Sequence, residues 1–146
     1  MDGSGRRTEN PGTGAVLVAV SLGGALGAVA RYLAGAVPGV SETGLLWVTL
    51  LVNVSGSFLI GVLMVFAAAL WPQRRLTQAF LGTGFLGGYT TFSTYAADAG
   101  MLLERGDAAA GLGYLALTLF AALAAVALGS AAASLIVRSR PVGGRR

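Results

Sequence analysis

The chain contains no cysteine, no histidine and no lysine. Without cysteine it cannot form disulfides or cysteine-bound iron–sulfur clusters, and without histidine it lacks the commonest general base and metal ligand. Charged residues make up only 11% of the sequence, whereas soluble domains carry about a quarter. Hydrophobic residues make up 55%, and the mean hydropathy is +0.74. The composition therefore favours an integral membrane protein.

Four long uncharged stretches cover residues 10–30, 43–73, 76–97 and 108–137. A membrane-spanning helix needs about 20 apolar residues. The sequence therefore predicts four spans in one membrane domain over 14–137, near 15–36, 46–71, 77–103 and 110–137. The first stretch has no convincing cleavage site and is interpreted as a span, not as a signal peptide. Residues 1–13 and 138–146 are expected to be mobile tails.

The arginines are distributed unevenly between the predicted loops. With four spans, both tails and the 72–76 loop share one side, which holds Arg6, Arg7, Arg74, Arg75, Arg138, Arg140, Arg145 and Arg146. Of the arginines outside the spans, only Arg105 is on the opposite side. Arginine-rich short loops stay in the cytoplasm, so we expect a multi-pass protein of the plasma (inner) membrane with cytoplasmic termini. The basic tails indicate contact with membrane lipid, not with nucleic acid.

The third uncharged stretch has the composition least suited to a regular helix. Residues 84–95 read Gly-Phe-Leu-Gly-Gly-Tyr-Thr-Thr-Phe-Ser-Thr-Tyr. Glycine weakens a helix by about 1 kcal/mol relative to alanine, and Ser and Thr divert backbone hydrogen bonds. Irregular backbone at membrane depth is tolerated only where protein buries it or where it lines a wet cavity. We therefore expect a functional site inside the bilayer.

Small residues spaced four apart predict close helix packing; the pairs are Gly23 and Gly27, Ser57 and Gly61, Gly84 and Gly88, and Gly129 and Ala133.

Three polar residues within the spans need an interpretation, and two of them allow more than one. Arg31 either snorkels to the headgroups or is a buried cation that attracts anions or binds neighbouring carbonyls. Asn53 is either a hydrogen-bonding contact between helices or an amide that lines a pore. Asp98 is interpreted as marking the outer edge of the membrane.

The segments 23–32, 49–56 and 84–95 together resemble the Fluc/CrcB family of fluoride channels in order and spacing. The resemblance implies an all-α integral membrane fold with four transmembrane helices, a broken third helix and an antiparallel dimer with two pores. It implies a fluoride-specific channel that exports the ion passively. It also implies a structural sodium ion at the dimer interface, held by the backbone carbonyls of Gly87 and Thr90.

The resemblance further implies which side chains border the fluoride path. Phe92 and Tyr95 match a pair of aromatics that edge the path, and Tyr114 matches a fourth-span tyrosine. Asn53 and Arg31 match a second-span asparagine and a first-span arginine. Asp98 stands where the family commonly has glutamate.

The chemistry of these side chains agrees with that assignment. Fluoride is tightly hydrated, so a pore must replace its water with many weak donors. Asn53, Ser93 and Thr94 offer N–H or O–H groups. The edge of an aromatic ring is positive, so Phe92 can face an anion without holding it too tightly, as conduction requires.

Two features depart from the family pattern. Tyr95 stands where a second phenylalanine is expected, and its hydroxyl either donates to fluoride or obstructs the path. An antiparallel homodimer requires one chain to insert both ways, which the arginine bias opposes. The second subunit is therefore expected to be either another copy or, as our hypothesis, an oppositely oriented paralogue.

Three alternatives come from other classes. A small multidrug exporter needs a membrane-embedded carboxylate in the first span, and none is present there. An intramembrane serine enzyme based on Ser55 or Ser57 would lack a histidine or lysine to activate the serine, so we expect no enzyme activity. A non-conducting structural subunit of a heterodimeric channel stays open.

Overall fold

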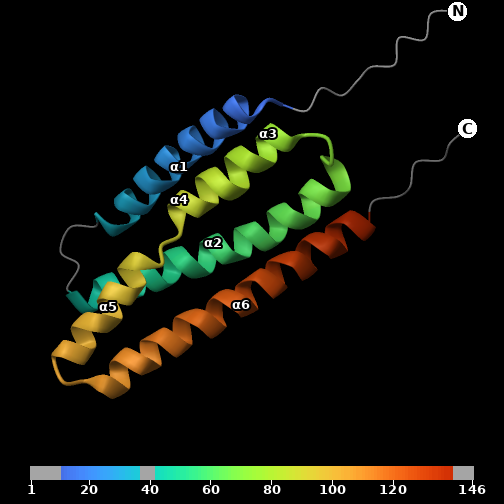
Figure 1. The fold of residues 1–146 in the computed structure, drawn as a ribbon. Helices are drawn as coiled ribbons and strands as arrows, with labels where there is room; N and C mark the ends of the chain where they lie inside the picture. The colour runs from blue at the N-terminus through green and yellow to red at the C-terminus, as the bar shows by residue number, and fades with distance from the viewer. Residues whose placement is uncertain (1–10, 37–41, 140–146) are drawn as a thin grey trace, which may run out of the picture.

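The computed structural model describes residues 11–36 and 42–139, and all regular structure in those ranges is helical (Figure 1). Three long helices are α1 (Thr13–Gly35), α2 (Glu42–Leu70) and α6 (Ala108–Arg138). Shorter segments lie between α2 and α6: α3 (Arg75–Gln78), the π-helical η1 (Ala79–Leu86), α4 (Gly87–Tyr89) and α5 (Ser93–Glu104). The described chain is therefore all-α, as predicted. Residues 1–10 and 140–146 of the predicted tails lie outside the described residues.

Three helices of the described chain are long and apolar enough to cross a membrane. They cover Thr13–Gly35, Gly44–Leu70 and Ala108–Arg138, with mean hydropathies of 1.9, 2.2 and 2.2. Many of their large apolar side chains point outward, among them Leu22, Leu26 and Leu123. Apolar surface on this scale is unusual for a soluble monomer, whereas a lipid-facing helix requires it. The chain is a multi-pass membrane protein.

The chain passes back and forth along one direction (Figure 1). α1, α2, the composite segment from α3 to α5, and α6 follow one another with alternating direction. The described beginning and end of the chain lie at the same end as the turn between α2 and α3. The turn between α5 and α6 lies at the other end. α1 packs on η1 and α4, and α2 packs on α6.

Glycines allow the closest approaches in both of these helix pairs. A Cβ added to Gly27 would clash with the Phe85 carbonyl oxygen, and one added to Gly88 would clash with the Gly24 carbonyl oxygen. In the second pair, a Cβ on Gly129 would clash with the Phe58 carbonyl oxygen. These contacts confirm the prediction of close packing at small residues.

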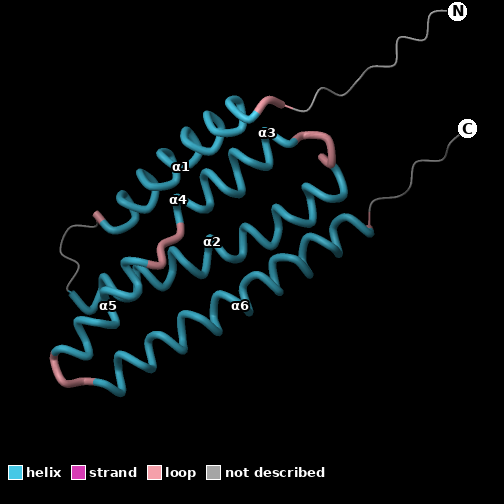
Figure 2. The backbone as a smooth tube through the Cα atoms, viewed as in Figure 1, coloured by secondary structure: helices cyan, strands magenta, loops and turns pink. Residues whose placement is uncertain are grey.

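The composite segment is not one continuous helix. Helical geometry ends at Tyr89, the backbone of Thr90 is extended (φ −78°, ψ 158°), and a helix resumes at Ser93. Figure 2 shows this interruption as a loop between α4 and α5. The break lies within the glycine- and hydroxyl-rich run in which the sequence predicts irregular backbone.

Candidate functional site

The helix break is held by a side chain from α2. The Thr91 amide donates to Asn53 Oδ1 at 2.8 Å, and Asn53 Nδ2 donates to the Thr91 carbonyl oxygen at 2.9 Å. One carboxamide thus bonds both backbone groups of Thr91, which lies in the break. Asn53 is only 8% exposed, so these bonds form away from bulk water. These bonds agree with the interpretation of Asn53 as a hydrogen-bonding contact between helices. A carboxamide has a second N–H, which these bonds do not use.

Thr91 also organises the start of α5. Its Oγ1 accepts from the Thr94 amide at 3.1 Å, and its hydroxyl donates to Thr94 Oγ1 at 3.0 Å. The Ser93 hydroxyl lies 3.4 Å from Thr91 Oγ1. Three hydroxyls therefore gather at the first turn of α5, two of them predicted site residues.

The break frees two backbone carbonyls. In a continuous helix the Gly87 carbonyl would accept from the Thr91 amide, and the Thr90 carbonyl would accept from the Thr94 amide. Those amides bond instead to Asn53 Oδ1 and Thr91 Oγ1. No other backbone amide of the described chain bonds to either carbonyl. Oxygen atoms of this kind suit a hard cation such as sodium, so the donor set fits the ion that the family resemblance implies.

Arg31 approaches the break from α1, whereas Asn53 approaches it from α2. Its Nε donates to the Gly88 carbonyl oxygen at 3.2 Å, and it does not line the groove described below. Of the two interpretations of Arg31, this contact favours the cation that binds neighbouring carbonyls. The guanidinium thus supports the backbone one residue from the freed Gly87 carbonyl.

Aromatic rings continue from the break toward α6. The Phe92 and Tyr95 ring centroids are 5.4 Å apart with the planes at 67°, an edge-to-face arrangement. The Tyr95 and Tyr114 centroids are 6.0 Å apart at 46°. Phe92 is 78% exposed, so most of its ring projects out of the subunit beside the polar break.

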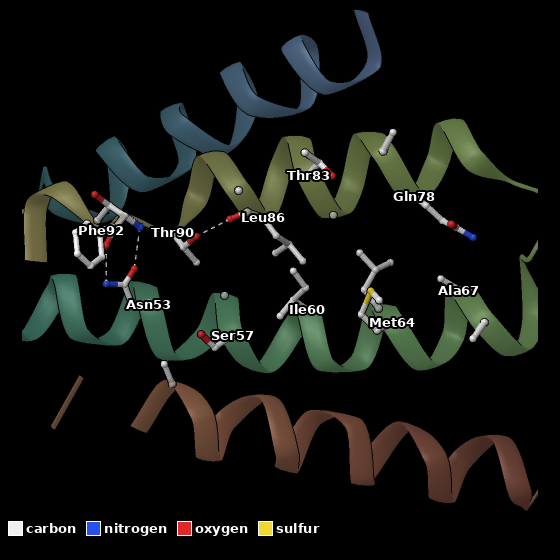
Figure 3. A pocket seen from close by; sticks show the side chains of 18 of the residues that line it. Asn53, Ser57, Ile60, Met64, Ala67, Gln78, Thr83, Leu86, Thr90 and Phe92 are labelled. Carbon is white, nitrogen blue, oxygen red and sulfur yellow. Dashed lines mark hydrogen bonds between the residues drawn. The ribbon is translucent and has the colours of Figure 1, made fainter. Parts of the chain in front are cut away.

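A groove of about 1090 Å³ runs between α2 and the composite segment (Figure 3). One end is lined by groups from the break and the aromatic pair: Asn53, Gly87, Thr90, Thr91, Phe92 and Tyr95. The middle is mainly apolar, with Ile60, Met64 and Leu86, although Ser57 and Thr83 also line it. Figure 3 shows Asn53 and Phe92 toward one end and Gln78 and Ala67 toward the other. The groove gathers Asn53, Phe92 and Tyr95 of the predicted path, while Ser93, Thr94 and Tyr114 lie outside its lining.

Thr118 on α6 is a further polar residue of the groove, and the sequence analysis missed it. Thr118 is 4% exposed, lines the groove, and its Oγ1 has no hydrogen-bond partner in the described part of the chain. Buried hydroxyls are normally bonded to protein or to ordered water, so this one can donate to water or to an ion in the groove. The signal in the sequence was its position four residues after Tyr114, on the same helix face.

The interpretation of Asp98 as a marker of the outer membrane edge stays a prediction, but the side chain does not lie on the surface of the subunit. It is 6% exposed and packs in the interior beside Ala99. The Tyr114 hydroxyl lies 3.4 Å from Asp98 Oδ2 and 3.3 Å from the Leu46 carbonyl oxygen, and its one proton is shared between these two acceptors. The Asp98 carboxylate thus orients Tyr114 behind the aromatic pair, because α5 packs directly on α6.

Known proteins resemble most of this chain. Residues 18–130 match the family described as CrcB-like protein, Camphor Resistance (CrcB). A protein of Nocardia farcinica named fluoride-specific ion channel FluC 2 is 50% identical over 119 residues, covering 82% of this chain and 85% of the relative. The FluC 2 of Streptomyces avermitilis is 47% identical over 114 residues (78% and 72%). The FluC 1 of Streptomyces coelicolor is 45% identical over 137 residues (94% and 86%). The chain belongs to the CrcB family.

Proposed function

We propose that this chain is the subunit of a fluoride-specific channel that lowers cytoplasmic fluoride by passive export. The observation that carries the proposal is the polar end of the groove. There, a donor-rich helix break adjoins an edge-on aromatic pair. Relatives whose names state fluoride-specific channel activity support the same conclusion.

The groups of the site can replace the hydration shell of a small anion. The unused N–H of Asn53, the orphan hydroxyl of Thr118 and the hydroxyls of Ser93 and Thr94 are donors of moderate strength. The positive ring edge of Phe92 adds an attraction without a hydrogen bond. Weak contacts at several positions allow the ion to bind and also to leave. The Tyr95 hydroxyl is assigned to the same path.

The complete pore needs a second subunit. A large apolar ring that is 78% exposed beside polar backbone, as Phe92 is, favours coverage by a partner. In an antiparallel dimer the Gly87 and Thr90 carbonyls of both subunits would face a common centre and hold a sodium ion there. When bound, that cation offsets the partial negative charge of the carbonyls and ties the two breaks together. Each subunit supplies two carbonyls.

The partner is another copy or an oppositely oriented paralogue, and the arginine distribution favours the paralogue. Arg74, Arg75 and Arg138 lie at the end that holds both described termini, and Arg105 lies at the other end (Figure 1). The other basic residues of the tails lie outside the described residues. We assign the termini to the cytoplasm of the plasma (inner) membrane and the composite segment to the third of four crossings. The names FluC 2 and FluC 3 of two Streptomyces avermitilis proteins support the idea of a paralogous partner.

The direction of flux follows from acid chemistry. Fluoride crosses membranes as neutral HF and ionises in the less acidic cytoplasm, which creates an outward gradient of the anion. A passive pore dissipates that gradient without an energy source.

Fluoride efflux from liposomes tests the proposal. The purified chain alone is compared with the chain mixed with its paralogue, with a fluoride electrode as the readout and chloride efflux as the control. Fluoride efflux in either sample supports a channel, and efflux from the mixture only supports an obligate heterodimer. Absence of efflux from both samples would contradict the proposal. Proton-coupled release of a cationic drug would instead support an exporter.

A further inference from the structure

The end of the groove farthest from the break carries a single charge. Arg75 is the only charged side chain among the described residues that line the groove. It is exposed, at the first residue of α3. Gln78, three residues later on the same helix face, also lines the groove. Gln78 Nε2 donates to the Trp71 carbonyl oxygen at 2.8 Å, which fixes α3 against the end of α2.

The neighbouring arginine is placed differently. Arg74 is also exposed, and with Arg75 it lines a separate small depression, but Arg74 does not line the groove. Two adjacent residues of the same charge therefore differ in whether they face the groove. If these arginines served only to set the orientation of the chain in the membrane, Arg74 and Arg75 would be equivalent, because the positive-inside rule counts both.

We propose that Arg75 gathers anions at the mouth of the groove and steers fluoride toward the break. This inference rests on the proposed channel function and adds a residue that sets the rate of ion arrival. No carboxylate of the described chain lines the groove to neutralise the guanidinium. The mainly apolar walls in the middle of the groove have a low dielectric constant. A charged cleft with such walls focuses the electric field and concentrates counter-ions.

The distance along the groove restricts Arg75 to the arrival step. At about 1.5 Å rise per residue, Arg75 and Phe92 are separated by roughly 25 Å. The Debye length is about 10 Å at 0.1 M salt and about 3 Å at 1 M. At 0.1 M the cation therefore acts on ions at the mouth and hardly on ions at the break. At 1 M its effect at the mouth also disappears.

The absence of cysteine from the chain allows the charge to be varied at one position in folded protein. Arg75→Cys is purified, and separate portions are treated with a trimethylammonium or a sulfonate methanethiosulfonate reagent. The portions are reconstituted in liposomes for fluoride efflux. Arg74→Cys, treated in the same way, is the matched control.

We expect Arg75→Cys to conduct more slowly than wild type at 0.1 M salt, by roughly three- to tenfold. The cationic reagent should restore the rate, the anionic reagent should lower it further, and all forms should converge at 1 M. Equal responses at positions 74 and 75 would overturn the steering role. So would equal slowing by both reagents, or an Arg75→Cys protein that stays silent after cationic modification while wild type conducts. A silent wild type, alone and with its paralogue, would overturn the channel function itself.

Discussion

The carboxamide of Asn53 bonds both backbone groups of Thr91, at 2.8 and 2.9 Å, across 38 residues of sequence. This pairing has the pattern of a short strand contact, but it joins a side chain of α2 to the break between α4 and α5. It fixes the backbone whose carbonyls and hydroxyls make up the site. The first role of Asn53 is therefore to hold the backbone of the break in place, whether or not its remaining N–H contacts an ion.

Replacement of Asn53 by alanine should abolish both bonds. The Thr91 amide would be left without a partner in a partly buried place, which costs about 1 kcal/mol or more. We expect a lower thermal midpoint in detergent and fluoride efflux reduced more than tenfold. Ser57→Ala, one turn later on α2 and also in the groove, is the control. Full efflux by Asn53→Ala would show that the break does not depend on this side chain.

The sequence predicted the helices and the region of the break, but not the contacts that hold the break. Long uncharged stretches predict helices because length and apolarity are local properties. The glycine–threonine run predicts irregular backbone for the same reason. The bonds from Asn53 to Thr91 and from Arg31 to Gly88 depend on how separate helices align in space. The burial of Asp98 and Thr118 depends on the same packing, which no local pattern contains.

Gly27→Ala tests the close contact of α1 with η1 and α4. A Cβ at this position would clash with the Phe85 carbonyl oxygen and approach the Tyr89 amide nitrogen to 2.8 Å. Backbone atoms cannot rotate away, so we expect destabilisation of about 1–3 kcal/mol, the usual cost of overpacking. Gly113→Ala is the matched control, because a Cβ there meets nothing within 4 Å. Similar thermal midpoints for the two variants would contradict the packing.

Thr118→Val is expected to affect fluoride efflux without lowering the stability of the protein. Valine has nearly the same shape and removes a buried hydroxyl that has no partner in the described chain. Removal of an unpaired polar group should leave stability unchanged or raise it by about 1–2 kcal/mol. If the hydroxyl serves as a donor to fluoride, efflux should fall although the fold is intact. A less stable variant would indicate that the hydroxyl bonds within the protein.

Sodium should stabilise the assembled protein through backbone carbonyls. A ligand that binds only the folded state adds about 2.7 kcal/mol at 100 times its dissociation constant. We therefore expect the thermal midpoint of the proposed dimer to rise with sodium at fixed ionic strength, with N-methylglucamine as the replacement cation.

Thr90→Val tests whether the Thr90 carbonyl or the Thr90 side chain is responsible for stabilisation by sodium. The Thr90 hydroxyl donates to the Leu86 carbonyl oxygen at 3.0 Å, so it bonds back along its own helix. Removing it leaves the Gly87 and Thr90 carbonyls in place. The variant should keep its sodium response, although its midpoint without sodium falls because the hydroxyl bond contributes about 1 kcal/mol. Loss of the sodium response with an intact dimer would assign the cation to the side chain and not to the freed carbonyls.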